Sequence, residues 1–272
     1  MVTGHNREPQ RDQALCRSVF YGALSLSLHR PSQESLESLR SEDARLALLD
    51  AADLLMAIAP PTNAPGEATA TDESAVDLVG RMNDWVQTFE SLTLEAWLHA
   101  YARLFGHTAR GLLCPYEAEY GQEGLFEQPR RLATIMGFYH AFGLTTRDAE
   151  RERADHISCE LEFLDFLSRK EAVALESYDA VLRSETQKAT RLFLRDHVGR
   201  FGFAFARLLR ENGPTGFWGR LGDLLFDFLT FECRRLGLPP GMPLLSLRSA
   251  EEDAVPMACG EPSDLIQLKI PG

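Results

Sequence analysis

Four side chains that could bind a metal ion or transfer a proton lie close together in the chain, at Asp155, His156, Cys159 and Glu160. On a helix, His156 and Glu160 would share one face because they are four residues apart, and Cys159 would lie near Asp155. One hypothesis is therefore a metal-dependent helical enzyme centred on His156 and Glu160. In the alternative interpretation, Asp155 caps a helix and His156 forms local hydrogen bonds.

The remaining histidines do not complete a metal site. A ferritin-like di-iron bundle uses two Glu-x-x-His pairs and two further glutamates. His99, His140 and His197 each lack a glutamate three residues earlier. The five cysteines are scattered without a Cys-x-x-Cys pair, which is typical of free thiols in a reducing compartment and not of structural zinc. We therefore expect no metal and no cofactor.

The sequence also lacks the common motifs of catalysis and phosphate binding. It contains no Gly-x-Ser-x-Gly nucleophile motif, no Gly-x-Gly-x-x-Gly loop and no Walker-type Gly-Lys-Ser/Thr. A cysteine–histidine pair formed only by the fold stays open, because its members need not be adjacent in sequence. The expectation is a protein that is not an enzyme.

Charge favours a basic partner and disfavours nucleic acid. The chain carries 28 lysines and arginines against 40 aspartates and glutamates, a net charge of −12, which repels a phosphate backbone. The acidic residues gather in two segments, which contain Glu117, Glu119, Glu123 and Glu127, and Asp148, Glu150, Glu152, Asp155, Glu160, Glu162 and Asp165. If these segments meet beside Tyr116 and Tyr120, they form a surface for a basic, apolar peptide. The alternative is a plain helical scaffold with a solvated acidic face.

Helical spacing of apolar residues runs through nearly the whole chain, without an alternating strand pattern or an internal repeat. The predicted fold is an all-α, compact bundle of roughly nine helices. Ser41 is an expected helix cap, and Gly106 and Gly143 are expected helix ends. The spacing from Leu194 to Leu208 predicts one continuous helix, and the basic residues between Arg183 and Arg210 are expected to face outward.

The predicted organisation is a single helical domain over residues 15–237. We expect a disordered tail at residues 1–14, a flexible loop rich in Pro, Ala and Thr at residues 60–72, and an irregular tail at residues 238–272. No apolar run approaches the roughly 18 residues of a membrane helix, and the N-terminus has no apolar region typical of a secretory signal. A cytoplasmic location is the resulting expectation.

Several segments resemble the TorD/DmsD/NarJ family of redox-enzyme maturation chaperones in both order and spacing. The chain from Glu152 to Leu164 is similar to the family signature Glu-x-x-Asp-His-x-x-x-Glu-Leu-x-x-Leu/Met, although Arg153 and Ala154 stand where the family often has a proline. The other resembling segments are Tyr101–Phe105, Leu132–Leu144 and Phe193–Val198. Pro115–Gly121 is similar to a segment of the subgroup that serves ethylbenzene and dimethylsulfide dehydrogenases and chlorate and selenate reductases.

This resemblance implies a non-catalytic cytoplasmic chaperone, as a monomer or a dimer. Its partner would be the catalytic subunit of a molybdopterin-containing oxidoreductase together with the twin-arginine signal peptide of that subunit. The chaperone would hold the subunit until the molybdenum cofactor is inserted, and so prevent premature export. The implied partner-binding residues are Tyr116, Glu117, Glu119, Tyr120, Tyr139, Glu152, Asp155, His156 and Glu160.

Overall fold

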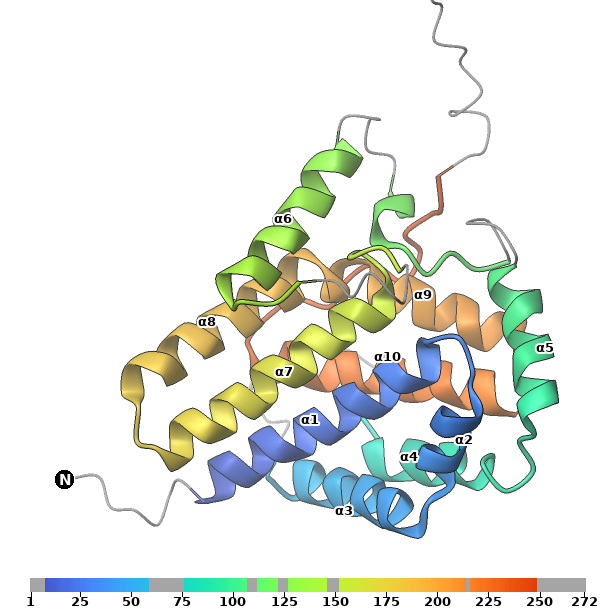
Figure 1. The fold of residues 1–272 in the computed structure, drawn as a ribbon, viewed down its shortest axis with the longest axis horizontal. Coiled ribbons are helices and arrows are strands. Elements are labelled where there is room, and N and C mark those ends of the chain that lie inside the picture. The colour runs from blue at the N-terminus through green and yellow to red at the C-terminus, as the bar shows by residue number, and fades with distance from the viewer. Residues whose placement is uncertain are drawn as a thin grey trace, which may run out of the picture.

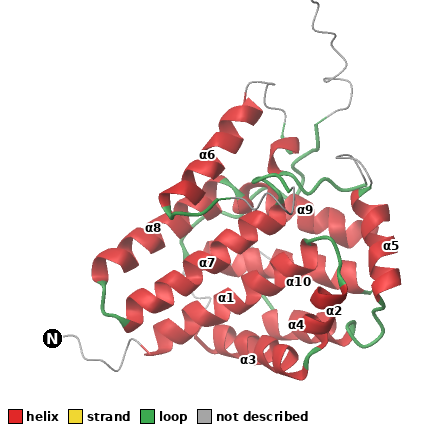
Figure 2. Cartoon of the chain, in the orientation of Figure 1, coloured by secondary structure: helices red, strands yellow, loops and turns green. Residues whose placement is uncertain are grey.

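The computed structural model describes residues 8–58, 76–106, 112–121, 127–145, 152–213 and 216–248. This part of the chain forms ten α-helices and a 3₁₀ helix, η2, which confirms the predicted all-α bundle (Figures 1 and 2). The helices are α1 (Glu8–Leu28), α2 (Gln33–Arg40), α3 (Glu42–Ile58), α4 (Leu78–Gln87), α5 (Leu94–Phe105), η2 (Glu117–Glu119), α6 (Glu127–Ala141), α7 (Ile157–Glu176), α8 (Ala180–Asp196), α9 (Val198–Asn212) and α10 (Phe217–Arg235).

Local chemistry sets several helix ends where the sequence predicts them. The Ser41 hydroxyl accepts a hydrogen bond from the Ala44 amide at 3.2 Å and so caps α3. Thr93 caps α5 in the same way. Gly106 ends α5 with a φ of 72°, and Gly143 follows α6 with a φ of 73°, a backbone conformation that favours glycine. In the described part, no helix has both the length and the apolar character needed to cross a bilayer.

The core forms where α1 and α7 lie side by side and α9 packs along α10 (Figure 1). Phe20 of α1 stacks on Phe228 of α10 with 4.7 Å between ring centroids. Buried polar pairs also join these helices: Arg17 pairs with Glu171 of α7, and the Tyr21 hydroxyl donates to Glu232 of α10 at 2.9 Å. Such pairs tie α1 to both neighbours.

Two helix boundaries differ from those that the sequence predicts: α1 begins earlier, and the helix predicted over residues 194–208 is divided between α8 and α9. α1 begins at Glu8, so residues 8–14 are helical and not part of a disordered tail. The helix predicted to run from Leu194 to Leu208 is broken at His197, which has φ −122° and ψ −102°. The break changes the course of the chain, and Gly199 fits beside it because any Cβ there would lie 2.3 Å from the Leu194 carbonyl oxygen.

The chain after α10 runs to the segment at residues 119–121 without forming a helix as far as it is described, to residue 248. Tyr120 and Leu247 form an isolated antiparallel β-bridge. The Gly121 amide donates to the Ser246 carbonyl at 2.9 Å, and the Arg248 amide donates to the Glu119 carbonyl at 3.0 Å. The expected flexible loop at residues 60–72 lies outside the described residues, as do residues 1–7 and 249–272 of the expected tails.

Candidate partner-binding site

The two acidic segments singled out in the sequence meet at the start of α7. The Glu117 amide donates to the Asp155 carbonyl at 2.9 Å, and the Ile157 amide donates to the Pro115 carbonyl at 2.8 Å. Tyr116 and His156 form an antiparallel β-bridge between these two contacts. We call this meeting of residues 115–121 with residues 152–160 the junction.

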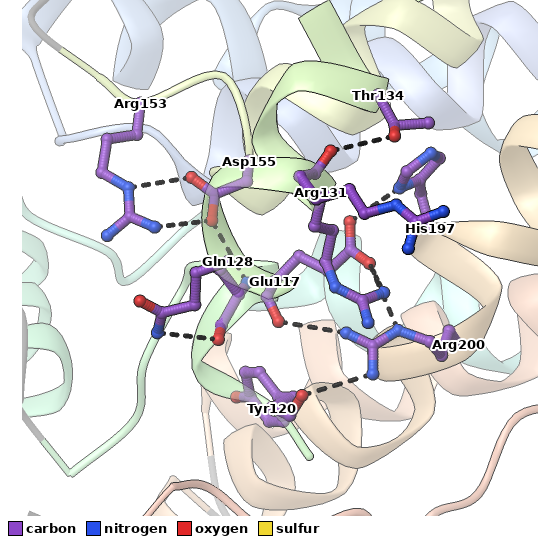
Figure 3. A network of polar contacts seen from close by, with 11 residues as sticks. Glu117, Tyr120, Gln128, Arg131, Thr134, Arg153, Asp155, His197 and Arg200 are labelled. Carbon is purple, nitrogen blue, oxygen red and sulfur yellow. Dashed lines mark hydrogen bonds and ion pairs between the residues drawn. The ribbon is translucent and has the colours of Figure 1, made fainter. Parts of the chain in front are cut away.

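The buried Asp155 carboxylate links the two segments of the junction through hydrogen bonds. Its carboxylate accepts from the Ala118 amide at 3.1 Å and from two nitrogens of Arg153 at 3.0 and 2.8 Å (Figure 3). The side chain is 0% exposed. Burial raises the pKa of this carboxyl, against the lowering effect of the Arg153 charge and the Ala118 hydrogen bond. Asp155 therefore connects two chain segments and does not cap α7.

Glu117 lies at the centre of a buried ionic cluster (Figure 3). One of its carboxylate oxygens contacts Arg131 at 2.9 Å and Arg200 at 3.2 Å, and the other contacts His197 Nδ1 at 2.9 Å. Burial alone would raise the pKa of Glu117, but the hydrogen bond from His197 and the charges of His197, Arg200 and Arg131 together lower it. The carboxyl is therefore ionised, and it joins η2 to α6 and α9.

Glu160 lies in the same interior, in surroundings that favour its neutral form. Its side chain is buried, and neither carboxyl oxygen receives a hydrogen bond from the described residues. Burial, together with the charges of Glu117 and Asp155, raises the pKa of Glu160 well above its ordinary value. The protonated carboxyl can donate a hydrogen bond to Glu117. The surroundings thus favour the ionised form of Glu117 and the neutral form of Glu160.

His156 is the residue that caps α7. Its Nδ1 accepts from the Ser158 amide at 3.2 Å and lies 2.6 Å from the Ser158 hydroxyl. Burial, with the charges of His29 and Arg153, lowers the pKa of His156 to about 3, so that the ring is neutral near pH 7. The prediction of local hydrogen bonding holds for His156, whereas the prediction that Asp155 caps the helix is wrong. Among the described residues, no three His, Cys, Asp or Glu side chains form a group that could hold a metal ion.

Most of the nine candidate residues point into the protein. Six are buried, namely Glu117, Tyr120, Tyr139, Asp155, His156 and Glu160. Tyr120 and Tyr139 donate their hydroxyls to the carbonyls of Cys114 and Ala154, at 2.8 and 2.9 Å, and so fix the backbone on both sides of the junction. Only Tyr116, Glu119 and Glu152 are partly exposed. The carboxylates of Glu117 and Asp155 therefore do not contribute to an acidic surface.

Sequence reasoning missed the partners of Glu117. Arg200 was expected on the outward side of a basic helix, but it points inward: besides its contact with the Glu117 carboxylate, it donates to the Glu117 and Tyr120 carbonyls, each at 3.2 Å. For His197, the sequence indicates only that no glutamate stands three residues earlier and that the residue belongs to a segment resembling the chaperone family. The sequence offers one signal for these contacts: aromatic residues of the kind usually buried flank His197 and Arg200. That signal does not reveal that both side chains contact the Glu117 carboxylate.

An apolar hollow of about 610 Å³ opens beside the junction, between α7, α8 and the chain that follows α6. Its apolar lining includes Leu144, Phe163, Phe166 and Leu182. Glu152 and Glu162 also line it, together with Arg169 and Lys170. Such a mostly apolar hollow with a few charged groups is typical of a binding site.

The family model described as nitrate reductase delta subunit matches residues 67–207, which is more than half of the chain. The chain belongs to the nitrate reductase delta subunit family. Two relatives are the perchlorate reductase assembly chaperone protein of Dechloromonas aromatica (strain RCB), 27% identical over 69% of this chain and 75% of that protein, and the chlorate reductase assembly chaperone protein of Ideonella dechloratans, 30% identical over 45% of this chain and 58% of that protein.

Membership of the nitrate reductase delta subunit family confirms the resemblance to TorD/DmsD/NarJ chaperones of molybdoenzymes. The segment that the family model matches contains the whole junction, from Pro115 to Glu160, and also Arg131, His197 and Arg200. The residues that build the ionic cluster around Glu117 thus all lie within the part of the chain that defines the family.

Proposed function

We propose that this member of the nitrate reductase delta subunit family is a cytoplasmic assembly chaperone for a molybdopterin-containing oxidoreductase. It binds the catalytic subunit of that enzyme, including the twin-arginine signal peptide, before the molybdenum cofactor is inserted. It keeps the subunit competent for insertion and delays its export. The chaperone itself transforms no substrate and carries no cofactor.

The observation that carries this proposal is the apolar hollow next to the junction. Phe163 and Phe166 offer aromatic surface, and Glu152 and Glu162 place carboxylates at the same hollow. A signal peptide combines an apolar stretch with basic residues, so both features of the hollow suit it. The names of the two relatives, which are assembly chaperones of perchlorate and chlorate reductases, support the same class of partner.

The proposal is tested with the full chain in a host that makes molybdopterin oxidoreductases. The tagged chain should co-purify with one catalytic subunit, identified by mass spectrometry, and that subunit should contain little molybdenum. Deleting the chaperone gene should leave the same oxidoreductase short of molybdenum and of activity. Normal molybdenum content and activity of every such enzyme in the deletion strain would rule the proposal out.

Removing the signal peptide from the identified subunit separates the two parts of the proposal. Weaker co-purification of the shortened subunit would support recognition of the peptide. Unchanged co-purification would show that the chaperone binds only the body of the subunit, and the peptide would then no longer be part of the proposed function.

A further inference from the structure

Three hollows meet at one carboxylate, that of Glu152. The apolar hollow is the first. A second, of about 630 Å³, lies between α1, α2 and α7 and has a polar lining that includes Ser25, Ser35 and Ser38. A third, of about 620 Å³, lies beside α5. Glu152 lines all three hollows. We call these three hollows, which share the Glu152 side chain, the Glu152 trough.

Further residues are shared between neighbouring hollows. Glu162 and Arg169 line both the apolar and the polar hollow. Arg30 lines both the polar hollow and the hollow beside α5. Each hollow alone is within the usual size of a site for one small molecule, about 300–1,000 Å³. Three in a row instead suit an extended polypeptide, whose successive side chains can enter successive hollows.

Glu152 contacts a tyrosine and a histidine, whereas Asp155 and Asp165 nearby each pair with an arginine. Its carboxylate accepts from the Tyr116 hydroxyl at 3.2 Å and lies 4.0 Å from His156 Nε2, in a ring that is neutral near pH 7. Within the described residues it pairs with no arginine or lysine. By contrast, Asp155 pairs with Arg153, and Asp165 pairs with Arg169.

The surroundings of Glu152 are suited to a guanidinium group. The Glu152 side chain is 25% exposed, so that it is partly withdrawn from water and yet open to a ligand. Charge-assisted hydrogen bonds in such a place are stronger than on an open surface, and a carboxylate can bind a guanidinium through two parallel bonds. Tyr116, which donates to Glu152, also accepts the Arg153 guanidinium on its ring face, 4.6 Å from the centroid.

We propose that Glu152 determines specificity by binding one arginine side chain of an extended partner segment that lies in the Glu152 trough. Apolar residues on one side of that arginine occupy the hollow lined by Phe163 and Phe166, and polar residues on its other side occupy the serine-lined hollow. The proposal rests on the proposed function, because it takes the segment to be the signal peptide of the catalytic subunit.

The test measures binding of a fluorescent peptide by polarisation. The peptide is the N-terminal segment of the catalytic subunit identified by co-purification. Glu152→Gln should raise the Kd about tenfold or more, because it removes the charge but preserves the shape. Glu176→Gln is the control: Glu176 is exposed at the end of α7 and lines none of the three hollows, and its substitution should change the Kd less than twofold.

A double-mutant cycle tests whether Glu152 contacts the peptide arginine directly. Because it also changes the peptide, its result does not rest on whether one chain variant folds correctly. Replacing the recognised peptide arginine by glutamine should weaken binding to the wild-type chain by the same factor as Glu152→Gln. The same peptide change should cost nothing further in the Glu152→Gln chain. Glu152→Arg should bind a peptide with glutamate at that position better than it binds the original peptide.

The possible results separate this inference from the proposed function. If the wild-type chain binds the peptide and Glu152→Gln binds it equally well, the inference is overturned and the chaperone function stands. Independent, additive effects of the peptide and chain substitutions would also overturn it. If the wild-type chain binds the catalytic subunit but not the peptide, the trough has another occupant and the inference again fails.

Discussion

Arg200 binds Glu117 at two places, because its Nε contacts the buried carboxylate and its Nη2 donates to the Glu117 carbonyl, each at 3.2 Å. A third contact, from Nη1 to the Tyr120 carbonyl, fixes the other end of η2. One side chain of α9 thus holds both the charge and the backbone of the junction, at a distance of 83 residues along the sequence.

Replacing Arg200 by methionine should therefore destabilise the whole fold. Arg131 and His197 still contact the Glu117 carboxylate in this variant, but the hydrogen bonds from Arg200 to that carboxylate and to two carbonyls are lost, which costs roughly 1–3 kcal/mol. Urea unfolding followed by circular dichroism measures the loss. Arg195→Met is the control, because Arg195 pairs with its exposed neighbour Asp196 and its loss should leave the unfolding free energy nearly unchanged. Equal losses in both variants would contradict the central role of Arg200.

Glu160→Gln should stabilise the protein increasingly as the pH rises above about 4.5. Because burial raises the pKa of Glu160 in the folded chain, the folded state holds a proton that the unfolded state has lost. The stability of the wild-type chain thus falls with rising pH, by up to about 1.4 kcal/mol per pH unit, until the pH reaches the folded pKa. Urea unfolding of both proteins at pH 5, 6, 7 and 8 measures the difference, and parallel curves would contradict it.

His156→Asn should flatten the acid side of the stability profile. The pKa of His156 is lowered to about 3 in the folded chain, whereas an unfolded histidine titrates near 6.5. The unfolded state therefore binds the extra proton between these values, and the wild-type chain loses stability as the pH falls below about 6.5.

Asparagine lacks this titration and can still cap α7 through its side-chain oxygen. Between pH 7 and pH 5 the unfolding free energy of the wild-type chain should thus fall relative to that of His156→Asn. Replacing the exposed His99 or His140 by asparagine serves as the control, and neither should change the slope. An unaltered slope in His156→Asn would show that folding does not lower the pKa of the ring.

Phe166→Asp should weaken co-purification of the catalytic subunit while leaving the fold intact. Phe166 is half-buried in the wall of the apolar hollow, so a charge there opposes binding of apolar residues more than it disturbs the core. We expect at least a tenfold loss of recovered subunit, with thermal unfolding measured in parallel. Phe166→Leu is the control and should retain most of the recovery. Full recovery with Phe166→Asp would place the subunit elsewhere.

Chelation should leave the protein unchanged if no metal acts at His156 and Glu160. The purified chain should contain well under one equivalent of iron or zinc by plasma mass spectrometry. Treatment with EDTA should not shift the thermal unfolding temperature. A stoichiometric metal whose removal lowers that temperature would support the metal-dependent enzyme instead.

The helices were predictable because their signals are local. Thr93 and Gly106 bound α5 through hydrogen bonds and backbone angles within one turn, so the sequence alone reveals them. The break at His197 was not predictable, because the apolar spacing continues through it without interruption. At the break, His197 contacts Glu117, which lies 80 residues earlier in the chain.

The sequence predicts which segments form the junction but not how their side chains are oriented. The resemblance located the junction, and the charge pattern correctly brought the two acidic segments together. It could not show that Glu117 and Asp155 turn inward, because their arginine partners come from separate segments. For Glu152, only the arrangement of three hollows around it shows why this acid differs from its neighbours.

The hydrogen bonds from Gly121 to Ser246 and from Arg248 to Glu119 have a consequence for biosynthesis. Residues 119–121 cannot complete their backbone pairing until residues 246–248 have left the ribosome exit tunnel. A nascent chain that stops at the end of α10 thus carries the helices but exposes an unpaired backbone edge beside Tyr120. Proteases should cut such a truncated product near that tyrosine sooner than they cut the finished chain.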